Sequence, residues 1–386
     1  MRVLFCTSIG ASHIFPIIPL AWALRVDGHE VLVATTRNYA GIVSSAGLYA
    51  VAIASDVDFA SLLTPLADSY YSGSPNGSAS GSAGRRPSRV SLIADALTDA
   101  LVHVAEAWRP DIIIHEPHQP GGAIAAARLG VPSVEHGWSI SHMRTAVDWF
   151  TEMSNVLSRH GISTPPAVCA GIDVAPPSMR TGKTLGWPMR YVPYNGGVVV
   201  PPWLWEQRTP RVAVTLGTYV PVLRGIEAIR WIVEEAAASD LEVVLALGKI
   251  DMQTFGNLPP NVRVSGWLPL HALLPTCRAI VHHAGAGSMM AALQAGVPQI
   301  ALPQGADQFF HADAIVQRGV GIAATSSNGG DALRTVLGDE RFVAAAREVR
   351  SEIRSMPPPS DIVAKLVSLA TGDVTTPVAQ RLTTEG

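Results

Sequence analysis

The stretch His282-His283-Ala284-Gly285-Ala286-Gly287-Ser288 decides the fold of the second half of this chain. It follows the apolar run 279–281, which predicts a strand, and precedes 289–294, which predicts a helix. A strand that leads through small residues into a helix leaves backbone N–H groups free at the positive end of the helix dipole. Such a turn binds phosphate without a lysine. The stretch fits neither a Walker loop nor Gly-x-Gly-x-x-Gly, so it predicts a phosphorylated ligand other than ATP in a P-loop or a dinucleotide.

Strand and helix patterns alternate on both sides of this stretch. In the first half they predict strands at 3–7, 31–35, 111–115 and 131–135 and helices at 16–27 and 122–129. In the second half they predict strands at 211–216, 242–247, 279–283 and 299–302 and a helix at 225–238. Repeated βα units build parallel sheets with helices on both faces. The sequence therefore predicts an α/β chain with two αβ halves.

The proline-rich segment 192–202 predicts the linker between these halves. We expect domains at 1–200 and 201–360. The Gly- and Ser-rich segment 68–89 predicts a mobile loop, which either covers the active site or is an inert insertion. Residues 361–369 predict a short helix that returns to the first domain, and the end of the chain predicts a disordered tail.

The composition is that of a packed globular protein, with 48% apolar and 15% charged residues in a chain of 386. A net charge of −3 gives no electrostatic reason to bind nucleic acid. The three cysteines, Cys6, Cys169 and Cys277, lie far apart, which favours a reducing cytoplasm over a disulfide framework. No apolar run reaches the roughly 18 residues of a membrane span.

Several motifs together resemble the family 1 glycosyltransferases. In the second half these are Gly266-Trp267-Leu268-Pro269-Leu270, His282 to Ser288, Gly296-Val297-Pro298-Gln299 and Asp307-Gln308. In the first half they are 10–16 and 28–31, and the passages 189–196 and 214–218 are similar to bacterial enzymes that attach deoxysugars to polyketide-type natural products. The resemblance covers nearly the whole chain. It implies the GT-B fold, in which two Rossmann-like domains face each other across a cleft.

The resemblance assigns the catalytic base of an inverting transfer to His13, which follows the first predicted strand. A histidine titrates in the range that this role needs. The alternative is a histidine that caps the following helix. A carboxylate usually orients such a base, and Glu116 follows a strand at the same sheet edge. Glu116 stands where the family has Asp, so it either takes this role or lies at the surface, and His118 competes with it.

The resemblance also assigns the donor site. His283 matches the family's pyrophosphate-contacting histidine, and Ala286, Gly287 and Ser288 match its donors to the diphosphate. Trp267 matches the residue that stacks on the nucleobase, unless it is a core tryptophan. The sugar-contacting residues are Asp307 and Gln308, with helix capping as a second role for Asp307. Gly217 and Thr218 end a strand on the phosphate side, and His282 faces the other way, into the core. Fixed donors stabilise the leaving diphosphate, so no metal or other cofactor is expected.

Two departures from the family pattern stand out. Ala291 replaces the ribose-binding glutamate of plant relatives, which suits a thymidine diphosphate donor because its sugar ring lacks one hydroxyl. His311 replaces an expected asparagine and leaves the sugar contacts open. The motif Asp56-Val57-Asp58 imitates the metal-binding Asp-x-Asp of the other major glycosyltransferase fold, but it lies far in sequence from the phosphate-binding half. We interpret it as a solvated loop.

Aromatic residues interrupt the βα rhythm at Trp138, Trp149 and Phe150. They either shape an acceptor pocket suited to a flat aglycone or form ordinary core packing. The expected activity is an inverting, metal-independent transfer of a deoxysugar from a dTDP-sugar to a hydroxyl of a polyketide-type or aromatic aglycone in antibiotic biosynthesis. The partners are the nucleotide diphosphate sugar and a small-molecule aglycone, and the sequence is compatible with a homodimer. The rivals are a UDP-sugar-dependent transferase on another small lipophilic acceptor, a nucleotide-sugar epimerase, and a non-catalytic helper.

Overall fold

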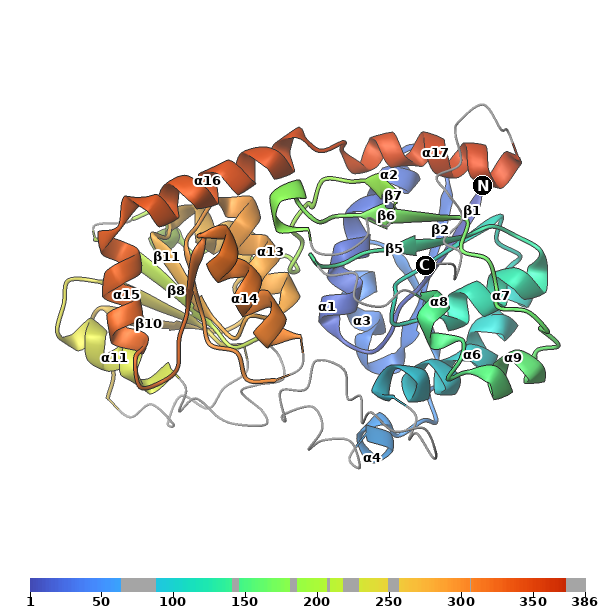
Figure 1. The fold of residues 1–386 in the computed structure, drawn as a ribbon, viewed down its shortest axis with the longest axis horizontal. Coiled ribbons are helices and arrows are strands. Elements are labelled where there is room, and N and C mark those ends of the chain that lie inside the picture. Colours follow the sequence, from blue (N-terminus) through green and yellow to red (C-terminus); the bar gives the residue numbers. More distant parts are fainter. Residues whose placement is uncertain are drawn as a thin grey trace.

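The computed structural model describes residues 1–63, 88–140, 146–180, 186–206, 209–217, 229–248, 257–305 and 307–372. Within these ranges the chain forms two parallel β-sheets, each packed between helices, which lie next to each other in the molecule (Figure 1). We call the part built on the first sheet the first lobe and the part built on the second sheet the second lobe. The predicted α/β fold with two parallel-sheet units is confirmed.

The sheet of the first lobe has the strand order β3-β2-β1-β4-β5-β6-β7. Its strands are β1 (Arg2–Cys6), β2 (Glu30–Thr36), β3 (Tyr49–Ile53), β4 (Ile112–His115), β5 (Ser133–His136), β6 (Ala170–Asp173) and β7 (Gly186–Pro188). Its helices are α1 (Ala11–Ile14), α2 (Ile18–Val26), α3 (Arg37–Ser45), α4 (Phe59–Leu63), α6 (Arg89–Trp108), α7 (Gly121–Leu129), α8 (Ala146–Trp149) and α9 (Ser154–Arg159).

The sheet of the second lobe has the strand order β10-β9-β8-β11-β12-β13. Its strands are β8 (Arg211–Thr215), β9 (Glu242–Ala246), β10 (Val262–Ser265), β11 (Ala279–His282), β12 (Gln299–Ala301) and β13 (Gly321–Ala323). Its helices are α11 (Arg230–Ala237), α12 (Leu270–Leu273), α13 (Ala286–Ala295), α14 (Gln308–Arg318), α15 (Gly329–Gly338) and α16 (Glu340–Ser355).

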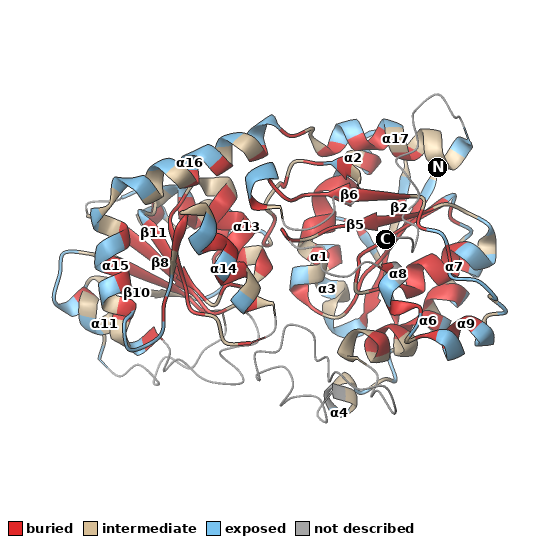
Figure 2. Cartoon of the chain, viewed as in Figure 1, coloured by how far each residue is buried: buried red, intermediate tan, exposed pale blue. Residues whose placement is uncertain are grey.

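The strands are mostly apolar because helices cover both faces of each sheet. Figure 2 shows the strands of both sheets coloured mostly as buried. All four residues of β4 are buried, and so are all five of β8. Parallel pairing brings the carboxyl ends of neighbouring strands to one edge, where doubly wound sheets bind their ligands. In the first lobe Cys6 of β1 pairs with His115 of β4. The residues that follow these two strands therefore meet at the same edge.

The end of the described chain returns to the first lobe. After α16, helix α17 (Pro359–Thr371) packs against α2 (Figure 1). Its buried residues Ile362 and Leu366 share a core cluster with Leu20 and Leu24 of α2. Burial of this apolar stripe anchors the last helix to the lobe in which the chain began. This is the return that the segment 361–369 predicts.

The predicted elements agree with the structure to within a few residues at their ends, with one difference that concerns the site. The sequence predicts a turn at 8–12, whereas the structure has the short helix α1 there, with His13 on it. Gly10 makes this possible because its φ of +124° reverses the chain before the helix. Of the predicted helix 225–238, residues 225–228 lie outside the described chain, as do most of the predicted loop 68–89 and the chain end after 372.

Candidate active site

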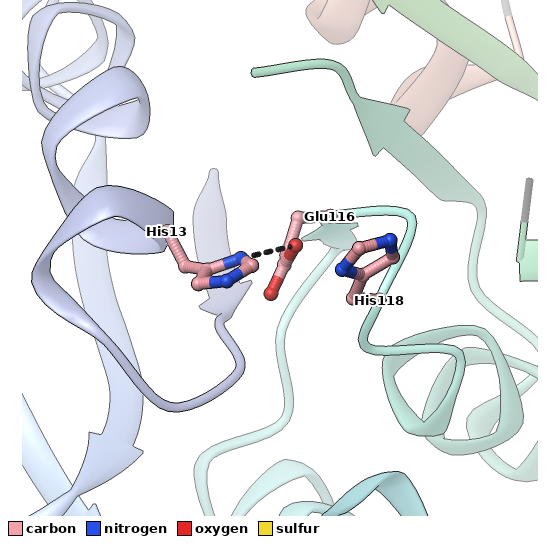
Figure 3. Close-up of side chains that lie close together, drawn as sticks. All are labelled: His13, Glu116 and His118. Carbon is pink, nitrogen blue, oxygen red and sulfur yellow. Dashed lines mark hydrogen bonds and ion pairs between the residues drawn. The ribbon is translucent and has the colours of Figure 1, made fainter. Parts of the chain in front are cut away.

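His13 and Glu116 meet at the carboxyl edge of the first sheet. The two residues are 103 positions apart in sequence, yet Nδ1 of the His13 imidazole lies 2.9 Å from Oε2 of the Glu116 carboxylate (Figure 3). The backbone N–H of Ser8 donates to the other carboxylate oxygen, Oε1, at 2.8 Å. Glu116 is 1% exposed and His13 is 18% exposed in their side chains. The carboxylate is therefore held on both oxygens, while the imidazole keeps an open side.

The electrostatics of this pair suit a general base. Burial opposes charge on His13, but the negative charge and the hydrogen bond of Glu116 outweigh it and raise the pKa of His13. For Glu116, burial favours the neutral acid, yet the His13 and His118 charges and the Ser8 N–H lower its pKa. Because an ionised carboxylate only accepts, Nδ1 of His13 carries the proton. Nε2 of neutral His13 is then free to take a proton from a substrate.

His118 and Trp138 complete the rim of this pair. The His118 ring lies 5.7 Å from the His13 ring, and Trp138 lies edge-on to both, at 5.3 Å from His13 and 5.2 Å from His118. Figure 3 shows His118 on the side of Glu116 opposite His13. His13, Glu116 and His118 also offer ligand atoms within 4.8 Å of one another, an arrangement that a metal ion could use. His13 is nevertheless the imidazole that makes the direct hydrogen bond to Glu116.

The pH dependence of turnover tests this pairing. In the wild type kcat/KM should rise with pH as His13 loses its proton, with a midpoint above the usual histidine value of about 6.5. Glu116→Gln removes the charge that stabilises the imidazolium, so the midpoint should move to lower pH and the plateau should fall by roughly 10²–10⁴-fold. A pH–rate profile of both enzymes measures this. A midpoint that stays in place or moves upward would contradict the assignment of Glu116.

The second lobe supplies the predicted phosphate cradle at the start of α13. Gly285 precedes the helix, and the first turn contains Ala286, Gly287 and Ser288. A first helical turn leaves backbone N–H groups without partners inside the helix. A Cβ on Gly287 would meet no heavy atom of the described chain within 4 Å, so the backbone here borders open space. The cradle is accessible to a ligand from that side.

His283 lies between the two glycines that border it, Gly217 after β8 and Gly285 before α13. A Cβ on Gly217 would lie 2.5 Å from His283 Cε1, and one on Gly285 would overlap the His283 ring. Burial lowers the pKa of His283 to about 4, so the ring is neutral near pH 7. Its buried Nδ1 has no hydrogen-bond partner among the described residues. A neutral imidazole in this position can offer an N–H to a phosphate oxygen.

The charge of Asp307 affects a histidine in each lobe, His13 in the first and His283 in the second. Its negative charge opposes the effect of burial on the pKa of both His13 and His283. The carboxylate, 41% exposed, makes no capping hydrogen bond to α14, so the capping role considered for it is wrong. The candidate base His13 and the histidine beside the predicted cradle, His283, are thus both affected by the charge of Asp307.

The other predicted donor residues differ in their burial and in their contacts. Trp267 is 47% exposed, which excludes a core role, and its Nε1 donates to the Asn195 carbonyl at 2.7 Å. Gln308 is 3% exposed and its Oε1 accepts from the backbone N–H of Gln304. Thr218 lies outside the described residues. His282 is fully buried, as predicted.

Two of the three predicted acceptor residues are core residues in this structure. Trp149 and Phe150 are 6% and 2% exposed and belong to the cluster that packs α6 and α7 on the sheet. Trp149 still reaches the site indirectly, with its ring 5.9 Å from His118. Trp138 alone of the three is partly exposed. Asp56 and Asp58 are exposed, and Asp58 accepts two hydrogen bonds from Ser61, as expected of a solvated loop.

Sequence reasoning missed two groups that hold site residues in place. Ser8 acts through its backbone N–H and Asn195 through its carbonyl, so neither side chain carries a signal. Asn195 lies in the predicted linker, and its hydrogen bond to Trp267 places this segment against a predicted donor residue. The available clue is that Ser8 stands two residues after β1, whose last residue, Cys6, pairs with the residue that precedes Glu116.

Family comparisons cover almost the entire chain. The model of the erythromycin biosynthesis protein CIII-like N-terminal domain matches residues 22–217, and that of the C-terminal domain matches 230–369. Elloramycin glycosyltransferase ElmGT of Streptomyces olivaceus is 39% identical over 95% of this chain and 97% of its own length.

Solved structures agree. The glycosyltransferase SnogD from Streptomyces nogalater is 38% identical, with a TM-score of 0.82 over 96% of this chain and 99% of that chain. The glycosyltransferase SsfS6 of Streptomyces sp. SF2575, complexed with thymidine diphosphate, is 29% identical, with a TM-score of 0.79 over 95% and 99%. This chain is therefore a GT-B glycosyltransferase that belongs to the erythromycin biosynthesis protein CIII-like family.

Proposed function

We propose that this enzyme transfers a deoxysugar from a dTDP-sugar to a hydroxyl group of a polyketide-type or aromatic aglycone, with inversion, in antibiotic biosynthesis. One observation carries the proposal: at the carboxyl edge of the first sheet the buried carboxylate of Glu116 holds Nδ1 of His13, whose side chain stays 18% exposed. The similarity to an elloramycin glycosyltransferase and to a transferase crystallised with thymidine diphosphate supports the substrate classes.

The geometry assigns a role to each group in the transfer. Nδ1–H of His13 is held by Glu116, so Nε2 takes the proton of the acceptor hydroxyl. The hydroxyl oxygen forms a bond to the anomeric carbon while the bond from that carbon to the diphosphate oxygen breaks on the opposite face. The N–H groups at the start of α13 and neutral His283 stabilise the charge on the departing diphosphate. The products are the glycoside, the nucleoside diphosphate and protonated His13.

A thymidine diphosphate donor is favoured by the residue at position 291. Ala291 is 1% exposed and packs with other apolar residues of α13 and its neighbours, so no carboxylate stands at this position to bind a ribose 2′-hydroxyl. Thymidine diphosphate should therefore raise the melting temperature more than uridine diphosphate at equal concentration, since a tenfold tighter Kd adds about 1.4 kcal/mol of stability. A thermal-shift titration measures this. Stronger stabilisation by the uridine nucleotide would overturn the dTDP assignment.

The acceptor proposal rests on Trp138. This partly exposed ring lies edge-on to the His13 ring at 5.3 Å, so an aglycone that touches Trp138 can present a hydroxyl to the proposed base. A flat aromatic aglycone gains from stacking on such a ring. Trp149, which is buried, packs with its ring 5.9 Å from the ring of His118.

We propose that the transfer needs no metal or other cofactor, because the amide donors of α13 and His283 supply the stabilisation that a divalent cation gives elsewhere. Turnover should remain unchanged, within about twofold, after dialysis against EDTA. A loss that Mg²⁺ or Mn²⁺ restores would contradict this.

No helix among the described residues is long and apolar enough to cross a membrane. We further propose a cytoplasmic enzyme, a proposal supported by the free cysteines Cys6, Cys169 and Cys277. The homodimer stays a prediction.

A further inference from the structure

His311 is a fully buried histidine on α14 that touches both lobes. Its Nε2 lies 2.7 Å from the hydroxyl oxygen of Ser139, which follows β5 in the first lobe. Its Nδ1 lies 2.9 Å from the carbonyl oxygen of Ala284, in the loop between β11 and the phosphate cradle. Ser139 is also buried, at 1% exposure. One imidazole thus joins the segment beside Trp138 to the loop beside His283.

The proton positions in this bridge follow from the partners. A carbonyl oxygen only accepts, so Nδ1 of His311 carries a hydrogen and donates to Ala284. In the neutral ring Nε2 is then an acceptor, and the hydroxyl of Ser139 donates to it. Both ring nitrogens are used, and neither is turned toward a sugar. His311 therefore does not take over the sugar contact that an asparagine at this position was expected to make.

A second histidine holds the same loop from its other side. The backbone N–H of Ala284 donates to His282 Nδ1 at 3.1 Å, and Nε2–H of His282 donates to Gln299 Oε1 on β12 at 2.9 Å. Ala284 has a φ of +61°, a left-handed conformation that a residue with a Cβ rarely adopts. Its N–H and its C=O are thus each held by a histidine. These two bonds keep the loop in the shape that leads His283 and Gly285 into the cradle.

We propose that His311 is a positioning residue that couples the diphosphate cradle of the second lobe to residues 137–140 of the first lobe, which we call the acceptor segment. The inference rests on the proposed function, because it assigns the two sites that are coupled. The bond to Ala284 shapes the cradle, and the bond to Ser139 sets the acceptor segment against it. Buried hydrogen bonds of this kind are costly to leave unmade, so the two segments favour one relative position.

Substitutions separate the two bonds. His311→Asn places an amide nitrogen near the position of Nδ1 and ends short of Ser139, so it keeps the bond to Ala284 and loses the bond between the lobes. Ser139→Ala loses only the bond between the lobes, and His311→Ala loses both. The matched control is Ser133→Ala, since Ser133 is also buried on β5 and its hydroxyl donates within the first lobe, to the Ala167 carbonyl.

The experiment measures the Kd for thymidine diphosphate, the KM for the aglycone and kcat in the wild type, the four single variants and the double variant His311→Ala/Ser139→Ala. Ser139→Ala and His311→Asn should keep the Kd within about threefold of the wild type and lose about tenfold in kcat/KM for the aglycone. His311→Ala should also bind thymidine diphosphate about tenfold more weakly, and adding Ser139→Ala to it should cause no further loss. Ser133→Ala should change none of these quantities beyond about threefold.

Amide hydrogen exchange tests the role of His311 without sugar transfer, and so separately from the proposed function. Thymidine diphosphate should slow amide hydrogen exchange at residues 137–140 in the wild type and in Ser133→Ala, but not in Ser139→Ala or His311→Asn. If the wild type transfers no sugar, the proposed function fails. The exchange pattern and the Kd values of the variants still test whether His311 couples Ser139 to Ala284. The coupling proposal is overturned if Ser139→Ala and Ser133→Ala show the same exchange pattern, or if His311→Ala binds thymidine diphosphate with the wild-type Kd.

Discussion

His13→Ala should lower kcat/KM by about 10²–10⁴-fold and leave the Kd for thymidine diphosphate within about threefold of the wild type. The reason is the separation of roles between the lobes. In the proposed mechanism His13 Nε2 accepts the proton at the edge of the first sheet, whereas α13 and His283 of the second lobe hold the diphosphate. Steady-state kinetics and isothermal titration of the nucleotide measure the two effects independently.

His118→Ala is the matched control for this substitution. His118 is a second imidazole beside Glu116, with its ring 5.7 Å from the ring of His13, and its removal also leaves a space in the same rim. It should cost no more than about tenfold, because Glu116 keeps its direct partner. Losses of equal size in the two variants, or a parallel loss of nucleotide binding in His13→Ala, would remove His13 from the role of base.

Gly287→Ala should weaken the binding of thymidine diphosphate by about 100-fold without lowering the melting temperature of the free protein. A Cβ at this position meets no heavy atom of the described chain within 4 Å, and alanine is a better helix former than glycine, so the fold is not disturbed. The added methyl group would instead enter the open space beside the first helical turn, whose backbone N–H groups are proposed to bind the diphosphate. A nucleotide titration and a melting curve of the free protein check both halves.

Gly338→Ala serves as the control, since Gly338 ends α15 and its Cβ would also meet nothing within 4 Å. It should bind thymidine diphosphate like the wild type. The cradle assignment fails if Gly287→Ala binds the nucleotide as tightly as this control.

The elements of the fold could be predicted because their signals are local. β11 and α13 were predicted from an apolar run followed by small residues, and they occupy Ala279–His282 and Ala286–Ala295. The same holds for β4, where a run of buried isoleucines needs no distant information. His282 was assigned to the core from strand alternation alone and is fully buried. Periodicity and chain direction are properties of consecutive residues, so the sequence displays them directly.

The short range of these signals also explains the errors. Trp149 and Phe150 were grouped with Trp138 because all three are aromatic and close in the chain. Their burial depends on α6 and α7, which no local pattern contains. Asp307 has the residue type and position of a helix cap, yet its carboxylate makes no capping bond in the structure.

The amino-acid order by itself predicted the two αβ halves and the turn proposed to bind phosphate, because apolar periodicity and small-residue turns lie in neighbouring positions. The family resemblance added the candidate base, His13. Tertiary structure decided that Glu116 meets His13 rather than lying at the surface, and it alone decided that His311 joins Ser139 to Ala284. These contacts link groups on different strands, helices and lobes. Their existence depends on sheet register and on how the two lobes stand against each other, and both are set only when the whole core is packed.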